Sequence, residues 1–284
     1  MATTAVVLVA VAVSAAVVSG GPSSPTSPVA LDALVVSASK ATLSQSTADL
    51  VLSGNLSLEG HTIPITGSGE ASLSTPQQVA VNVSMALPGS TLQEKEVEAG
   101  GDLYLAIDAE GQDVSAVVPG KHWVELPTPV GAAGSLGTGT SDPLAQLQLL
   151  QAKGNTVTSL GTGVIDGVSA SGYAVTISHA NVVQAEQRFV SSSGLDATTR
   201  QEVAQAEEKL GTPTIDVWFD SSKLLRRISF SEHQTLDGST VSVDLDMDFV
   251  HYGAPVSIST PSADDVVPFS QFEAAAQSAA GNAS

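Results

Sequence analysis

A chain of 284 residues, 42% of them hydrophobic, is long enough to bury a substantial core. Its 10 basic and 29 acidic residues give a formal net charge of −19, which argues against binding to nucleic acids or to anionic lipid surfaces. The absence of cysteine excludes disulfides, thiolate catalysis and thiolate metal sites.

Residues 1–21 predict a signal peptide or an N-terminal anchor. The stretch from Ala5 to Val18 is apolar apart from one serine, a length that suits a signal peptide and falls short of the ~20 residues of a membrane span. A buried helix is the alternative, but the stretch has no polar face. The first four residues carry no Lys or Arg, which departs from the usual signal peptide. Residues 22–30, rich in Ser and Pro, predict a flexible linker.

Residues 31–270 predict a single domain that begins with a helix and continues with strands. Leu31 to Leu43 has apolar residues at helical spacing, and from Ala48 the pattern changes to an alternation of apolar and polar residues. We expect breaks near Gly54, at Pro64 and at 67–69. The expected strand segments are 48–59, 61–73, 79–86, 103–105, 121–126, 156–166, 168–179, 215–220, 224–233, 241–249 and 256–260.

Two further helices interrupt the strands. After a loop over 128–140, Asp142-Pro143 is a helix start, in which Asp142 caps free amides and Pro143 fits the first helical position. Residues 198–210 predict a polar, amphipathic helix, and an Ala-rich tail follows from 271 to 284.

These segments predict a mainly β, α+β fold. It contains a curved antiparallel half-barrel sheet of ten or eleven strands, with helices covering the concave face. Such a sheet has one apolar face, and a curled sheet with helices across its mouth makes a cavity.

Most patterns that suggest chemistry have a simpler structural interpretation. Asp244, Asp246 and Asp248 resemble the start of a calcium loop, but the alternation is that of a solvated strand face. The glycines at 67–69 and 161–163 complete no phosphate-binding motif and predict bends or bulges. None of the five histidines lies three or four residues from another, so we expect single exposed histidines. No catalytic site, metal or cofactor is predicted.

Two further features are the tryptophans and an arginine doublet. The two tryptophans, Trp123 and Trp218, are expected in the core, with the lining of a ligand cavity as the alternative. Arg226 and Arg227 form the one strong basic doublet, which we expect to be exposed and to offset nearby acids.

The order of several phrases resembles the LppX/LprG-type envelope lipoproteins, whose fold is similar to that of the LolA and LolB lipoprotein carriers. The resemblance covers about residues 30–269. The phrases that carry it are Asp142-Pro143-Leu144 with its Leu-rich helix, 157–168, 172–175, 216–220, 224–228, 248–256, Pro261 and 264–266.

The resemblance implies a protein that holds acyl chains on the concave face of its sheet and carries or presents lipids without catalysis. One departure concerns the lipobox, which ends in an acylated cysteine in that family. Val18-Ser19-Gly20 matches the residues that precede this cysteine, but Gly21 stands where the cysteine belongs, so thioether lipidation is impossible. The protein is then either released after cleavage or held by its uncleaved N-terminus.

The sequence therefore predicts an exported, monomeric carrier of an acylated lipid or glycolipid in the bacterial cell envelope. The alternative is a structural or sensory module of the same fold with a filled core. A hydrolase is the third class, but clustered Ser, His and acidic residues are missing. The expected lining of the lipid cavity is Val217, Phe219, Phe230, Leu245, Met247 and Phe249, with Leu144, Leu147 and Leu150 near the mouth.

Overall fold

The structure is a computed structural model that describes residues 28–58, 61–74, 77–100, 102–126, 147, 150–184, 213–236 and 239–281. Several sequence-based predictions fall outside these residues, among them the loop at 128–140 and the helix start at Asp142-Pro143. The others are the signal peptide or anchor at 1–21, most of the linker that follows it, the position of Leu144, and the helix at 198–210.

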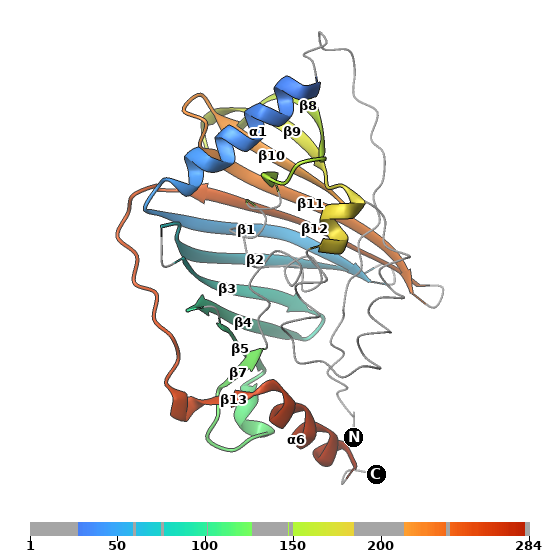
Figure 1. Ribbon diagram of the computed structural model, residues 1–284. Coiled ribbons are helices and arrows are strands. Elements are labelled where there is room, and N and C mark those ends of the chain that lie inside the picture. The colour runs from blue at the N-terminus through green and yellow to red at the C-terminus, as the bar shows by residue number, and fades with distance from the viewer. Residues whose placement is uncertain are drawn as a thin grey trace.

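One large, curved sheet makes up most of the described chain (Figure 1). Its twelve-strand path runs β13-β7-β5-β4-β3-β2-β1-β12-β11-β10-β9-β8, and a short β6 pairs with β5. Neighbours are antiparallel except β13 and β7, which are parallel. The strands are β1 (Thr47–Leu58), β2 (His61–Ser72), β3 (Gln78–Leu87), β4 (Ser90–Ala99), β5 (Asp102–Ala109), β6 (Gln112–Asp113), β7 (Trp123–Leu126), β8 (Thr156–Ile165), β9 (Val168–Thr176), β10 (Thr214–Asp220), β11 (Leu225–Leu236), β12 (Ser239–Val250) and β13 (Val266–Pro268).

The predicted fold class is therefore confirmed, as a mainly β, unclosed half-barrel. The described residues form thirteen strands instead of ten or eleven. Two of them, β6 and β13, are too short to show an alternation that a sequence pattern would reveal. Described helical segments are α1 (Pro28–Leu43), η1 (Val114–Ala116), η2 (Ala263–Asp265), α6 (Phe269–Gly281), the positions of Leu147 and Leu150, and 179–184. Among the described helices, none combines the length and the apolarity needed to cross a bilayer.

The predicted breaks in the first two strands are wrong. β1 and β2 each run unbroken for 12 residues. Pro64 lies opposite Asn55 of β1, but the pairing of β2 with β3 begins only at Ile65, so the missing N–H of the proline costs no hydrogen bond to β3. A Cβ at Gly69 would lie 2.4 Å from the carbonyl oxygen of Ala80. Glycine there permits a close approach of strands and marks neither a bend nor a bulge.

The second glycine cluster does contain the expected bulge. The register between β8 and β9 shifts between Ser159 and Gly161, and Gly161 has a φ of 93°. This conformation lies in the left-handed region, which glycine adopts without strain.

The C-terminal region differs from the predicted strand at 256–260. Residues 254–262 have no regular structure, and prolines at 255 and 261 bracket the segment. The backbone N–H of Ser257 donates to the Glu70 carboxylate (3.0 Å) instead of to a neighbouring strand. The Ala-rich tail begins inside α6, which extends to Gly281.

Two clusters of buried apolar residues hold the fold together. The main core lies between α1 and the inner, concave face of the sheet, and includes residues from β1–β3, β8–β12, Leu147 and Leu150. The small core consists of Val114, Val124 and Val267, against which Val118, Leu126, Phe269 and Phe272 pack. It joins β7, β13 and α6 at the other end of the sheet (Figure 1).

Candidate functional site

The inner face of the sheet presents continuous rows of apolar side chains. Because strand side chains alternate between faces, residues paired directly across neighbouring strands lie on the same face. One row, which we call the central row, contains Val83, Gly67, Leu52, Met247, Ile228, Val217 and Tyr173. Met247, Ile228 and Val217 are each 0% exposed. The row crosses seven strands without a charged residue.

The predicted cavity residues lie together on this face. Five of them are at most 2% exposed, namely Val217, Phe219, Leu245, Met247 and Phe249, and Phe230 is half-buried beside the same core. Leu147 and Leu150 belong to the main core as well, with exposures of 0% and 2%. Whether these residues enclose a lipid stays a prediction, and Leu144 lies outside the described residues.

The apolar face ends at β4. Glu94, Glu96 and Glu98 pair with Val83, Val81 and Val79 and therefore lie on the inner face. Burial raises the pKa of Glu94. The buried side chains of β4, Val97 and Ala99, lie on the outer face instead. The three glutamates thus border the central row on one side, a placement that needs the register of β3 with β4 and that the sequence alone did not reveal.

The outer face of β10–β12 carries charge. Arg227 bonds to Asp248 through Nε and Nη2 (2.5 and 2.7 Å) and to Asp246 (2.7 Å), and Ser231 donates to Asp244. The three aspartates form a strand face, as expected, and are not part of a calcium loop. Because Asp248 accepts from the guanidinium, the pKa of Arg227 is raised.

The arginine doublet does offset nearby acids, but it is less exposed than expected. The Arg226 side chain is 21% exposed and forms an ion pair with Asp220 (2.6 Å), whose side chain is 5% exposed. Its guanidinium also lies over the ring of Tyr252. This cluster fastens the turn after β10 to the end of β12.

The prediction that the tryptophans anchor the core is wrong for Trp218. Trp218 is half-buried on the outer face and covers two glycines, so that a Cβ at Gly172 would lie 2.7 Å from its ring and a Cβ at Gly163 would lie 3.0 Å away. Trp123 is half-buried at the start of β7. Neither residue lines the inner face near the central row.

A shallow groove of about 580 Å³ lies at the β13 end of the sheet. The pKa of Tyr104 in this groove is raised by burial and by the carboxylates of Asp102 and Glu125. It is lined by Tyr104, Glu125, Thr260, Pro261, Ala263, Val266 and Pro268. The groove combines parts of the chain that are far apart in sequence and was not predicted.

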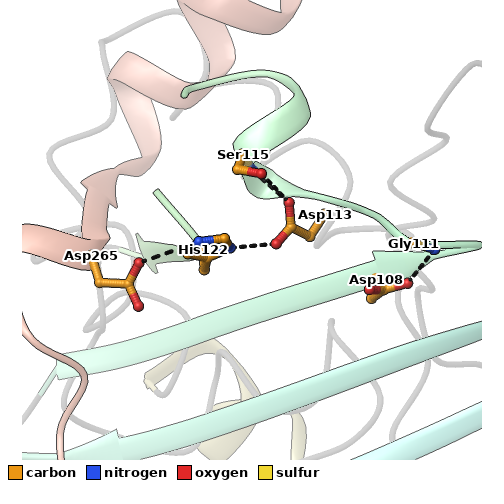
Figure 2. A network of polar contacts seen from close by, with 6 residues as sticks. All are labelled: Asp108, Gly111, Asp113, Ser115, His122 and Asp265. Atoms are coloured by element: carbon orange, nitrogen blue, oxygen red, sulfur yellow. Dashed lines mark hydrogen bonds and ion pairs between the residues drawn. The ribbon is translucent and has the colours of Figure 1, made fainter. Parts of the chain in front are cut away.

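A polar network surrounds His122 (Figure 2). Asp113 caps η1 by accepting from the Ser115 N–H (2.9 Å) and the Ser115 hydroxyl, and its second oxygen contacts Nδ1 of His122. The Ser115 and His122 contacts lower the pKa of Asp113 to about 2, and Asp113 raises the pKa of His122. Nε2 of His122 lies 4.0 Å from Asp265, and its backbone N–H donates to the Asp265 carbonyl.

The order of these groups is not that of a hydrolytic triad. In a triad the histidine lies between the nucleophile and the acid, whereas here Asp113 lies between Ser115 and His122. His122 therefore cannot take a proton from Ser115 directly. The network attaches the segment before β13 to the segment before β7, and it corrects the expectation that His122 stands alone.

No known protein family matches the chain, and a search of curated proteins found no relative. Several solved structures are similar to it. LprF from Mycobacterium bovis is 16% identical, with 86% of this chain and 100% of that chain covered and a TM-score of 0.43. The lipoprotein LppX from Mycobacterium tuberculosis is 15% identical, with 82% and 100% covered and a TM-score of 0.44. A putative outer membrane lipoprotein-sorting protein domain from Vibrio parahaemolyticus is 6% identical, with 81% and 95% covered and a TM-score of 0.32.

The predicted resemblance to LppX-type proteins is confirmed, since LppX and LprF are among the similar solved structures. At these identities and TM-scores the likeness says nothing about what the chain binds. Function has to be inferred from the chain's own residues.

Proposed function

We propose that this protein binds an acylated lipid or glycolipid on the inner face of its sheet and carries or presents it in the bacterial cell envelope, without catalysis. The observation that carries the proposal is the central row, an uncharged apolar surface that runs across seven strands. Burying acyl chains against such a surface gains ~0.8 kcal/mol per CH₂. The ion pairs of Arg227 with Asp246 and Asp248 lie on the other face of the sheet.

The boundary between α1 and the sheet offers a route by which the ligand enters. α1 packs against β8 and β11, so an acyl chain enters between the helix and the sheet and takes the place of helix side chains on the main core. Separating two packed layers is easier than opening a hydrogen-bonded sheet, because the backbone hydrogen bonds between the strands stay intact.

The apolar stretch at 5–18 supports an exported protein that is either released as a monomer or anchored by this segment. The order of groups around His122 supports a binding role over a catalytic one.

A structural or sensory module remains the second candidate. The observation in its favour is the near-complete burial of Met247, Val217 and Phe249 by the protein's own residues. In that function the same side chains fill the core permanently and no acyl chain is admitted.

The first experiment is native mass spectrometry and organic extraction of the full-length protein from its host's envelope, followed by titration with a fluorescent octadecyl probe. Stoichiometric lipid and probe binding support the carrier. Met247→Asp places a carboxylate in the central row and should abolish binding, because an acyl chain that covers the row would strip the water from an unpaired charge. Ser242→Asp, on the opposite face of β12, is the matched control and should bind like the wild type.

A variant that keeps the core apolar covers the case in which Met247→Asp does not fold. Val217→Phe should fill part of the central row and shift the preference from octadecyl to dodecyl probes. Unchanged binding by folded Met247→Asp and Val217→Phe would remove this face from the site. Lipid-free wild-type protein that ignores both probes would favour the structural or sensory module.

A further inference from the structure

Two polar side chains on the inner face of α1 have buried atoms without a hydrogen-bond partner. Ser39 is 0% exposed, and its hydroxyl makes no hydrogen bond. Oδ1 of Asp32 is buried and unpartnered as well. The two residues lie seven positions apart, which is about two helical turns, so they share one face of the helix. Val35 and Thr42, both fully buried, lie on the same face.

The neighbouring side-chain hydroxyls of α1, those of Ser37 and Thr42, both have hydrogen-bond partners. Ser37 donates to the carbonyl oxygen of Leu34 (2.9 Å). Thr42 donates to the carbonyl oxygen of Ala38 (3.0 Å) and accepts the N–H of Leu225 (2.9 Å). Ser39 makes neither kind of contact. An unmade hydrogen bond in the interior costs free energy, and such groups in a native protein call for a missing partner.

The helix that carries these atoms packs on the sheet that forms the proposed acyl site. α1 packs against β8 and β11, and Figure 1 shows it lying along the β8–β11 end of the sheet. Leu31 and Leu34 of the same helix pack against the main core. A molecule between α1 and the sheet therefore meets apolar side chains on one side and the Ser39 and Asp32 oxygens on the other.

The chemistry of the two groups limits what they bind. A carboxylate oxygen only accepts hydrogen bonds, whereas a serine hydroxyl both donates and accepts. A phosphate or carboxylate offers no proton to Asp32 and is repelled by its charge. An ammonium offers protons but leaves the Ser39 proton without an acceptor. A group with several hydroxyls satisfies both side chains.

We propose that the inner face of α1 binds the uncharged, polyhydroxylated headgroup of the carried lipid, a glycerol or a sugar, through Ser39 and Asp32. This inference rests on the proposed carrier function and adds the headgroup class. The acyl chains lie on the central row, and the headgroup hydroxyls lie under α1.

The test compares four probes with a common octadecyl chain, added to delipidated full-length protein: a monoacylglycerol, an alkyl glucoside, an alkyl phosphate and an alkylamine, with the fatty acid methyl ester as the reference. The wild type should bind the glycerol and sugar probes more tightly than the methyl ester. Ser39→Ala combined with Asp32→Asn should lower the affinity for those two probes by about five-fold or more, since a hydrogen bond contributes about that factor. The affinity for the methyl ester should not change.

The matched control is Ser37→Ala on the same helix, whose hydroxyl already has a partner. It should keep the wild-type preference. If the wild type binds all probes equally, or prefers the phosphate or the amine, the headgroup inference is wrong while the carrier function stands. If the double variant still prefers the glycerol and sugar probes, the headgroup hydroxyls bind elsewhere and α1 is not the headgroup site. If no probe binds, the carrier function itself fails.

Discussion

The two ends of the sheet are held by different forces. From β3 to β9, buried apolar side chains of the inner face form the main core with α1. At the β4–β13 end the inner face of β4 carries three glutamates, and the small core has only three buried members. There the last strand is three residues long, pairs in parallel with β7, and is fastened by the contacts of His122 with Asp113 and Asp265.

The main-core end therefore determines the stability of the sheet, whereas the polar contacts at the β13 end only hold the C-terminal segment in place. Apolar burial stabilises the main-core end as a unit, because each side chain there contacts several others that are themselves buried. The β13 end depends on a few polar contacts and a small core. We therefore expect the C-terminal segment, β13 with α6, to detach without unfolding the rest of the sheet.

The largest expected effect is at the main core. Phe249 is 0% exposed, and Phe249→Ala should lower the free energy of unfolding by about 3–5 kcal/mol, because the removed ring leaves a cavity. Denaturant unfolding followed by circular dichroism measures it. A loss below about 1 kcal/mol would mean that the core collapses onto the gap and is less tightly packed than described.

A smaller and local effect is expected at the small core. Val267 is 2% exposed between β7 and α6, and Val267→Ala should destabilise the C-terminal segment by about 2 kcal/mol. Amide hydrogen exchange should increase in 266–281 and stay unchanged in β1 and β12. Faster exchange in β12 would show that the two ends unfold together and would remove the distinction between them.

The smallest effect is a pH dependence at His122. Its pKa is raised above 6.5, so its contribution is complete below that pH and is lost as the pH rises through the raised value. Asp113, with a pKa lowered to about 2 from 3.8, contributes above 3.8 and loses its effect as the pH falls towards 2. Proteolysis of the C-terminal segment should therefore be faster at about pH 9 than at about pH 5.5.

His122→Ala should remove this difference between the two pH values. The control is His61→Ala, since His61 is exposed at the start of β2, far along the sheet from β13. A pH difference that persists in His122→Ala would assign the effect to other groups. If His61→Ala also lost the difference in proteolysis between the two pH values, the effect would likewise not be specific to His122.

Strand positions were predictable where alternation is strong. Leu245, Met247 and Phe249 alternate with aspartates, so that β12 and its inner face follow from the sequence. Gly54 and Pro64 were misread as breaks, because local propensity cannot reveal that neighbouring strands approach closely or that pairing stops at Ile65. Pairing across the sheet, rather than local preference, keeps these residues in strands.

The polar features could not be predicted, since each depends on distant segments. Asp113, His122 and Asp265 come from three parts of the chain, and no spacing rule connects them. The glutamates of β4 lie on the inner face only because of their register with β3. Ser39 looked like any helical serine, and its missing partner follows from its burial under the packed helix.

The pairing of β1 with β12 has a consequence for folding. Residues 49–58 pair with residues 241–250, so the central joint of the sheet connects an early part of the chain to a late one. During synthesis, β1 to β5 can form a meander of neighbouring hairpins, but the free edge of β1 has no partner until β12 has been made. Contacts of such large sequence separation slow folding and leave a long strand edge exposed to other chains. The central joint of the sheet therefore closes late, and the time needed to synthesise residues 59–250 sets how long the edge of β1 is exposed to aggregation.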